Sequence, residues 1–239
     1  MWGIVKGEEP GCLPKLRAEL GADWGNVYGD QKEEMRKALC RDQGFVCAYC
    51  QSRIAPREDG EGPLARVEHW ETRALNPARV FDWRNLLGVC QGDVVTESEA
   101  PPPMPGHPET GQVHARLHCD NHRGSLPPEG QALHLCLTHP VAAGRVRFSG
   151  AGQVWSDDPD VQADIVILNL NIWRLVANRR AAVDHVARVA GDPPRASELR
   201  KLLERVERRD DDGRFAEYAA AMAYIARRLL HRAEARARG

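Results

Sequence analysis

A glutamate and a histidine stand side by side at Glu68 and His69, and an asparagine follows at Asn85. Phosphodiester hydrolysis needs a base that takes a proton from water and a divalent cation that stabilises charge on the departing oxygen. An imidazole titrates near neutrality and suits the base, and a carboxylate suits a hard cation. Neighbouring side chains of a regular strand point to opposite faces, so the pair can converge only at a strand end or a twisted position. Asn85 has an amide that can fix the imidazole, through the loop backbone or the ring.

Four of the seven cysteines suggest a metal site. An odd number of cysteines in a chain of this length predicts metal ligation better than a disulfide framework. Cys47 and Cys50 form a C-x-x-C, and Cys90 and Cys119 are the natural second pair. Four thiolates suit a structural Zn²⁺, and a long excursion between ligands is tolerable because loop-closure entropy grows only logarithmically. His118 is an alternative ligand. The plainer interpretation makes Cys47 and Cys50 a redox pair or core residues.

The polar residues also have a plainer interpretation. An isolated Glu-His pair is usually surface decoration, and an asparagine before Leu-Leu is usually a turn residue. Their common order with the four cysteines is what favours a site.

Composition limits the partners. The chain has 239 residues, 42% hydrophobic and 28% charged, with a formal net charge of -1 and a pI of about 6.8. There is no global positive field that would draw it onto nucleic acid, so such a partner must be held by a local patch or by another subunit. No apolar stretch is long enough to cross a bilayer and the opening residues lack a leader pattern, so we expect a cytoplasmic protein with no membrane contact.

Periodicity predicts an α+β protein that is mainly helical, with a zinc-supported core and a small β-hairpin. We expect one unit of N-terminal helices over 1–44, a core over 45–157 with a mobile insertion at 91–118, and C-terminal helices over 158–239. Gly44 is expected to end the N-terminal helices. The expected strands cover 65–70, 86–89, 132–140 and 144–156, with a turn at 149–152, and helical spacing runs from 160 to a break at 191–194 and resumes over 196–209 and 213–239.

Four segments together resemble an HNH endonuclease of the zinc-supported ββα-metal class. In the common form of that family the last segment reads C-N-x-x-K-G and closely follows the third cysteine, whereas here it reads C-D-x-x-R-G after a long insertion. This interruption resembles one branch, the PtuB-like HNH subunit of Septu anti-phage defence, also found beside some retrons. The segments are CAYC at 47–50, VEHW at 67–70, DWRNLLGVC at 82–90 and HCDNHRG at 118–124, and VKGEEP at 5–10 and ILNLN at 167–171 resemble the same branch.

The resemblance implies roles for the polar residues. His69 would be the general base, Glu68 and Asp120 the ligands of a catalytic Mg²⁺ or Mn²⁺, and Asn85 the orienting residue. Asp120 stands where the family more often has Asn or His, and a carboxylate is a suitable hard ligand.

The register of the last metal ligand stays open, because Asn121 and His122 are neighbours that could replace Asp120. Pro127 and Pro128 predict that the helix of the ββα unit is short or displaced.

Arginines crowd the motif although the whole chain is nearly neutral, and arginine forks bind phosphate. Arg123 occupies the family's basic position, and Arg66 and Arg84 are the further nucleic-acid contacts that we expect. The plainer interpretation is that several of these arginines pair with nearby acids.

The predicted function is a metal-dependent nuclease that acts on nucleic acid, with DNA favoured over RNA. Resemblance to the Septu branch implies a partner, a PtuA-like ATPase of the ABC/SMC type. The alternatives are an RNA (tRNA) nuclease with the same chemistry and a non-catalytic zinc module that binds nucleic acid or a protein. The apolar stripe of the last helix favours core packing, and a docking surface is the alternative.

Overall fold

The structure is a computed structural model, and it describes residues 3–19, 21–57, 63–92, 117–139 and 144–238. Helices and two small antiparallel hairpins make up the fold, which confirms the expected α+β class with mainly helical content. In the described part of the chain, no helix is long and apolar enough to cross a membrane. The expected insertion at 91–118 falls almost wholly outside the described residues, and the proposed division at 44/45 and 157/158 stays a prediction.

The N-terminal helices are α1 (Cys12–Ala18) and α2 (Gly29–Gln43). Gly44 ends α2 in the left-handed conformation with φ 64°, and its amide donates to the carbonyls of Arg41 and Cys40. An added Cβ would collide with the Phe215 ring, so glycine is needed both for φ and for space. The predicted helix stop is confirmed.

Two antiparallel strands and a short helix follow in order: β1 (Arg66–His69), β2 (Leu86–Val89) and α3 (Cys119–Gly124). Glu68 pairs with Leu87 and His69 with Leu86. Alternation therefore sends Glu68 and His69 to opposite faces of the hairpin. All of β2 is buried and α2 packs against both strands, while α3 is a single short helix that ends before Pro127, as expected.

The second hairpin joins β3 (Arg147–Phe148) and β4 (Val154–Trp155) around the predicted turn. The strand expected at 132–140 is absent from its described residues, 132–139. Its amides are satisfied differently, because those of His134 and Leu135 donate to the buried Asp164 carboxylate. Leu135 and Leu137 are both buried, and their alternation with less apolar residues in the sequence resembles the pattern of a strand.

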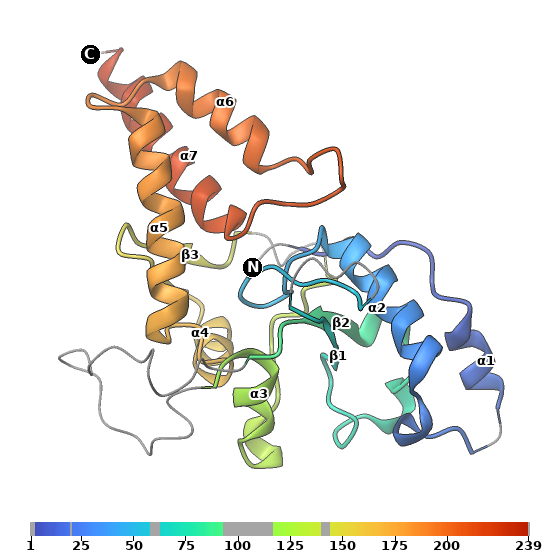
Figure 1. Ribbon diagram of the computed structural model, residues 1–239. Helices are drawn as coiled ribbons and strands as arrows, with labels where there is room; N and C mark the ends of the chain where they lie inside the picture. The colour runs from blue at the N-terminus through green and yellow to red at the C-terminus, as the bar shows by residue number, and fades with distance from the viewer. Residues whose placement is uncertain (1–2, 20, 58–62, 93–116, 140–143, 239) are drawn as a thin grey trace, which may run out of the picture.

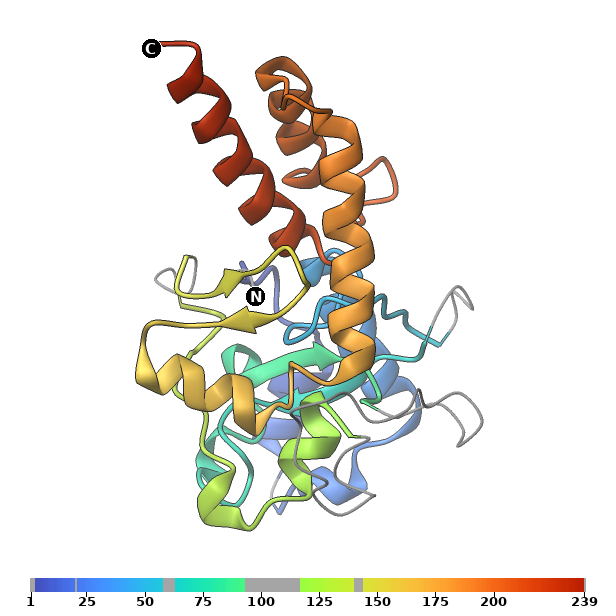
Figure 2. The ribbon, with the colours of Figure 1, turned by 90° about the vertical axis from the view of Figure 1, so that its left-hand side faces the viewer.

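Four helices complete the described chain: α4 (Pro159–Ile167), α5 (Trp173–Ala190), α6 (Ala196–Val206) and α7 (Ala219–Arg236). The single helical stripe expected from residue 160 is interrupted after α4, where Asn169 has φ 46°. Helix α7 begins six residues later than expected from Gly213. Helices α5, α6 and α7 pack on one another and rise as an arm above the hairpin and α3 (Figures 1 and 2).

Most of the apolar stripe of α7 is core, as favoured from the sequence. Met222 and Ala226 are buried in a cluster with residues of α5 and α6, and Ile225 and Leu229 pack against it. The hydrophobic core below this cluster surrounds the four cysteines and β2.

Candidate metal centre and adjoining cleft

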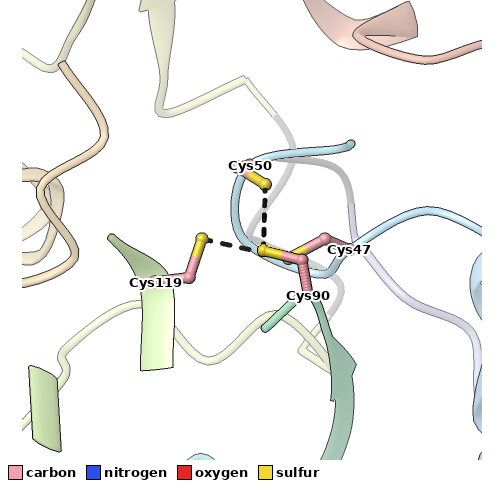
Figure 3. Close-up of side chains that lie close together, drawn as sticks. All are labelled: Cys47, Cys50, Cys90 and Cys119. Atoms are coloured by element: carbon pink, nitrogen blue, oxygen red, sulfur yellow. Dashed lines mark hydrogen bonds between the residues drawn. The ribbon is translucent and has the colours of Figure 1, made fainter. Parts of the chain in front are cut away.

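Cys47, Cys50, Cys90 and Cys119 converge on one buried point, with sulfur atoms that all lie within 4.8 Å of one another (Figure 3). The Cys47 and Cys119 sulfurs are 4.0 Å apart, and those of Cys50 and Cys90 are 3.7 Å apart. A tetrahedral zinc with Zn–S bonds of about 2.3 Å places its sulfurs roughly 3.8 Å from one another, whereas a disulfide needs about 2 Å. The four cysteines could therefore hold a metal ion such as zinc.

Three elements bring the sulfurs together. Cys47 and Cys50 lie on a tight turn whose arms are bridged at Val46 and Arg53. Cys90 directly follows β2, and Cys119 is the first residue of α3. Hydrogen bonds with Cys119 and Cys47 hold the pKa of the Cys50 thiol well below its usual value, which favours a thiolate ligand.

His118 supports this cluster from outside the set of four sulfurs. Its Nδ1 lies 3.2 Å from the Cys119 sulfur and 3.9 Å from the Cys90 sulfur. Its Nε2 lies 3.0 Å from a guanidinium nitrogen of Arg174 on α5, which can only donate. Nε2 is therefore the acceptor, and Nδ1–H points toward the Cys119 and Cys90 sulfurs. This arrangement makes His118 an outer partner of the metal site rather than a fifth ligand.

A cleft of about 470 Å³ lies beside the cysteine cluster, at the end of β1. Glu68 and His69 line it from β1, and Asp120 lines it from α3. Glu68 and His69, which leave β1 on opposite faces, therefore reach the same cleft at the end of the strand, as the sequence required. The other lining residues are Thr72, Arg73, Ala74, Arg123, Gly124 and Gln131.

His69 is fixed as a neutral imidazole. Its Nε2 lies 2.9 Å from the Val80 carbonyl, which can only accept, so Nε2 carries the proton and Nδ1 keeps a lone pair. The Trp24 ring packs edge-on at 4.4 Å between centroids. Burial lowers the pKa of His69 to about 4; the hydrogen bond with Val80 opposes this to a smaller extent, and the charges of Arg73 and Arg123 add to the lowering. The ring is therefore a deprotonated acceptor near neutral pH.

Asn85 acts on the loop and not on the ring. Its side chain is fully buried and its Oδ1 accepts from the Glu71 amide at 2.8 Å. Its Nδ2 donates to the carbonyls of Glu71 and Arg79, both at 3.1 Å. Arg79 precedes Val80, whose carbonyl holds the His69 ring. Of the two ways of fixing the imidazole that the sequence allowed, the structure has the one through the backbone.

Glu68 and Asp120 form a carboxylate pair flanked by arginines. Burial, and then the Asp120 carboxylate, raise the pKa of Glu68 to about 8. The Glu68 carboxylate accepts from Arg123 at 2.7 Å, and Asp120 pairs with Arg66 at 3.1 Å. Two hard oxygen donors on one cleft wall fit the ligand preference of Mg²⁺ or Mn²⁺.

The neighbours of Asp120 are engaged elsewhere. The Asn121 side chain accepts from Arg66 and donates to the Gln91 carbonyl. His122 Nδ1 lies 2.8 Å from the Ile167 carbonyl. Of the three candidates for the last ligand, Asp120 is the one that lines the cleft.

Arg123 has a different place from the one expected. It is 1% exposed and donates to the Glu68 carboxylate and to the carbonyls of His69, Trp70 and Gln131. The expectation of a phosphate-binding fork is corrected by this geometry, because these four bonds direct the guanidinium inward. Arg123 instead ties α3 to the end of β1 and positions Glu68.

The remaining arginines are more exposed. Arg66 pairs with Asp120 and Asn121 and keeps a half-exposed side chain, and Arg84 is exposed but outside the cleft lining. Arg79 pairs with Glu71 and Asp82, as the plainer interpretation expected. Arg73 lines the cleft and is exposed, so it is better placed than Arg123 to meet a phosphate.

Some features of the site left no signal in the sequence. The Val80 carbonyl is a backbone group, and Trp24 comes from a segment far from the motif. Tyr49 is another: its hydroxyl is buried and has no hydrogen-bond partner within the described residues. Glu68, Arg123 and Asp120 are among the charges near it.

Fold and site together define a small α+β protein in which four cysteines that could hold a metal ion lie beside a cleft that carries a histidine and two carboxylates. No family model matches the chain. It is similar to the Septu protein PtuB of Bacillus thuringiensis, with 32% identity over 77 residues. This stretch is 32% of the chain and 28% of the length of that relative, and over it the chain is PtuB-like.

Proposed function

We propose that the protein is a metal-dependent HNH-type endonuclease that hydrolyses phosphodiester bonds of DNA as the nuclease subunit of a Septu-type anti-phage defence complex. The observation that supports the chemistry is the His69 ring, held neutral by Val80 with Nδ1 as acceptor, in the same cleft as Glu68 and Asp120. The similarity to a Septu protein supports the defence role.

Glu68 and Asp120 would hold the catalytic cation, because they are the carboxylates that line the cleft. When bound, Mg²⁺ or Mn²⁺ supplies positive charge that stabilises the departing 3' oxygen. The cysteine cluster would hold zinc and shape the cleft without taking part in the reaction.

The chain's own residues supply the rest of the mechanism. His69 Nδ1 accepts a proton from the attacking water, while Nε2–H stays bonded to Val80. Asn85 keeps the loop that carries Val80 in place. Arg73 and Thr72, on the cleft wall, would contact the phosphate, and Arg123 positions Glu68.

Replacing His69 by alanine tests this proposal. His69→Ala should fold, keep its metal in the cysteine cluster and lose cleavage of plasmid DNA by at least about a hundredfold, the usual contribution of a general base. The measurements are circular dichroism, metal content and a plasmid assay with Mg²⁺, run with and without the partner ATPase. Cleavage at the wild-type rate would show that His69 is not the base.

Two alternatives give different results in the same experiments. An RNA nuclease would leave plasmid intact and cut total RNA or tRNA. A non-catalytic zinc module is favoured by one observation, the inward Arg123–Glu68 pair that already occupies a proposed metal ligand. Such a module would bind without cleaving either polymer at any Mg²⁺ concentration.

The proposed partner is a PtuA-like ATPase of the ABC/SMC type, inferred from the likeness to a Septu protein. Copurification of the tagged chain with that ATPase, followed by mass measurement of the complex, tests the partnership. Separate elution of the two proteins would argue against it.

A further inference from the structure

A second cleft, of about 440 Å³, lies at the foot of the α5–α7 arm and has no lining residue in common with the first. It opens between the C-terminal half of α6, the loop that leads to α7, and the arm of the cysteine turn. Six of its ten lining residues are cationic and two are acidic: Arg53, Lys201, Arg205, Arg208, Arg209 and Arg214 against Glu204 and Asp210, with Phe215 and Ala216.

Two of these arginines build the wall. Arg209 donates to the carbonyls of Arg41 and Asp42 at the end of α2, both at 2.7 Å. Arg53 donates to the Phe215 carbonyl at 2.8 Å and to Phe45 at 3.2 Å. These bonds fix the loop against the core, so the cleft does not depend on a ligand for its shape.

Other cations of the cleft are available to a ligand. Arg205 and Arg208 are exposed, and the guanidinium group of neither has a hydrogen bond or ion pair among the described residues. Lys201 has only a 3.4 Å pair with Glu198, on a largely exposed side chain. Asp210 is occupied in part, since it accepts from the Arg214 amide. The exposed Asp211 and Asp212 follow in the loop but do not line the cleft.

The arm as a whole also has an excess of positive charge. Residues 173–239 hold sixteen lysines and arginines against ten acids, whereas residues 1–172 hold seventeen against twenty-four. An anionic polymer would therefore meet the molecule at the arm, although the net charge of the chain is -1.

We propose that this cationic cleft binds the phosphate backbone of nucleic acid, as an anchoring site separate from the cleft that carries Glu68 and His69. Its contacts are with phosphate, so it adds affinity and salt dependence and no sequence preference. The choice of nucleic acid as ligand rests on the proposed function, but binding at the cleft does not require cleavage.

The test compares two charge reversals of equal size in the full chain. Arg205→Glu with Arg208→Glu alters the cleft, and Arg188→Glu with Arg232→Glu alters exposed arginines of α5 and α7 outside it. Anisotropy of a fluorescent DNA duplex gives Kd without added divalent cation, between about 50 and 200 mM salt. Thermal unfolding and metal content verify that both variants are folded.

The cleft variant should bind at least about tenfold more weakly, and its slope of log K against log salt should be smaller by about two, since each phosphate contact contributes roughly 0.9. The control variant should stay close to wild type. Wild-type affinity and slope in the cleft variant would overturn the proposal. It would also fail if poly-L-glutamate bound as tightly as DNA and both were lost equally, which would indicate a surface for an acidic protein.

Cleavage and binding are measured separately, so this inference and the proposed function can fail separately. If the wild type cuts neither plasmid nor RNA with Mg²⁺ while the cleft variant loses duplex binding, the nuclease assignment fails and the anchoring site stands. If the wild type cuts DNA while the cleft variant keeps the wild-type Kd and salt slope, the nuclease assignment stands and the anchoring site fails.

Discussion

At the scale of single residues, the cleft depends on contacts that fix the orientation and the tautomer of its side chains. The His69 imidazole is held in one tautomer because its partner is a carbonyl, which leaves only Nδ1 as an acceptor. That carbonyl is in turn placed by the Asn85 amide, which donates to the carbonyl of the preceding residue, Arg79. Asn85 holds the loop, and the loop places the carbonyl that orients His69, so Asn85 is a positioning residue.

Asn85→Asp tests this order with almost no change of shape. The new carboxylate can still accept from the Glu71 amide, but it cannot donate to the carbonyls of Glu71 and Arg79. The Arg79 carbonyl keeps the Asp82 amide as a donor, whereas the Glu71 carbonyl loses the bond from Asn85. Two lost bonds, with a carboxylate now facing both carbonyl oxygens, should lower the free energy of unfolding by about 2–4 kcal/mol. Denaturant unfolding measures this change, and cleavage should fall in samples that are still folded.

The exposed Asn26 gives a matched control, because Asn26→Asp makes the same chemical change away from the loop. It should unfold within about 0.5 kcal/mol of wild type. Equal stability of Asn85→Asp and Asn26→Asp would mean that the amide does not hold the loop.

Two buried tyrosines predict opposite effects of the same substitution. The Tyr49 hydroxyl has no partner among the described residues, whereas the Tyr218 hydroxyl bonds to Ser52 at 3.0 Å and to Asn178 at 3.1 Å. Tyr49→Phe should leave the free energy of unfolding unchanged or raise it by about 1–3 kcal/mol, and Tyr218→Phe should lower it by roughly 1–2 kcal/mol. A large loss of stability in Tyr49→Phe would reveal a bond that the geometry lacks.

At the scale of elements, local sequence signals predicted what local contacts decide. Gly44 ended α2 because a left-handed residue was needed there, and β2 was found as a short apolar run with no polar member. The segment at 132–140 was misread because alternation reports burial and not the hydrogen-bond partner. Its partner, Asp164, comes from α4, which no nearby residue could indicate.

The pair formed by His134 and Asp164 makes the packing of α4 on this segment sensitive to pH. The Asp164 carboxylate is 2% exposed and accepts from the His134 Nδ1 at 2.9 Å. That hydrogen bond raises the pKa of His134 above 6.5. The protonated ring favours the folded state, so this stability is fully present below pH 6.5 and is lost as pH rises through the raised pKa of the folded state.

His134→Gln should therefore remove part of the pH dependence of unfolding. Because the ring is 44% exposed, the effect is expected to be less than about 1 kcal/mol. Urea unfolding on either side of neutrality measures it, with His231→Gln on α7 as a control at an exposed position. An unchanged difference between acid and alkaline stability in His134→Gln would contradict the role of this pair.

At the scale of the whole molecule, spacing predicted which residues could meet but not how they are held. The C-x-x-C turn and the order of the motifs indicated four thiolates and the convergence of Glu68 with His69, and the structure brings those residues together. The pairing of Arg123 with Glu68 agrees with the plainer interpretation of the arginines. The full burial of Arg123 could not be foreseen, because its other acceptors are the carbonyls of His69, Trp70 and Gln131. The positive charge of the arm was visible in the sequence, but the cleft at its foot needed the fold.

The cysteine cluster joins segments from residue 47 to residue 119 in the middle of the largest core cluster, so a bound metal should govern the stability of the molecule. Cys119→Ser removes one of its four sulfurs. It should lower the metal content well below one per chain and the free energy of unfolding by about 4 kcal/mol or more, since metal binding to a structural site is folding free energy. Atomic absorption and thermal unfolding measure both. Cys136→Ser is the matched control, because that sulfur is half-buried beside Thr138 and outside the cluster. Full metal content in Cys119→Ser, or metal loss in Cys136→Ser, would show that the four sulfurs do not form the metal site.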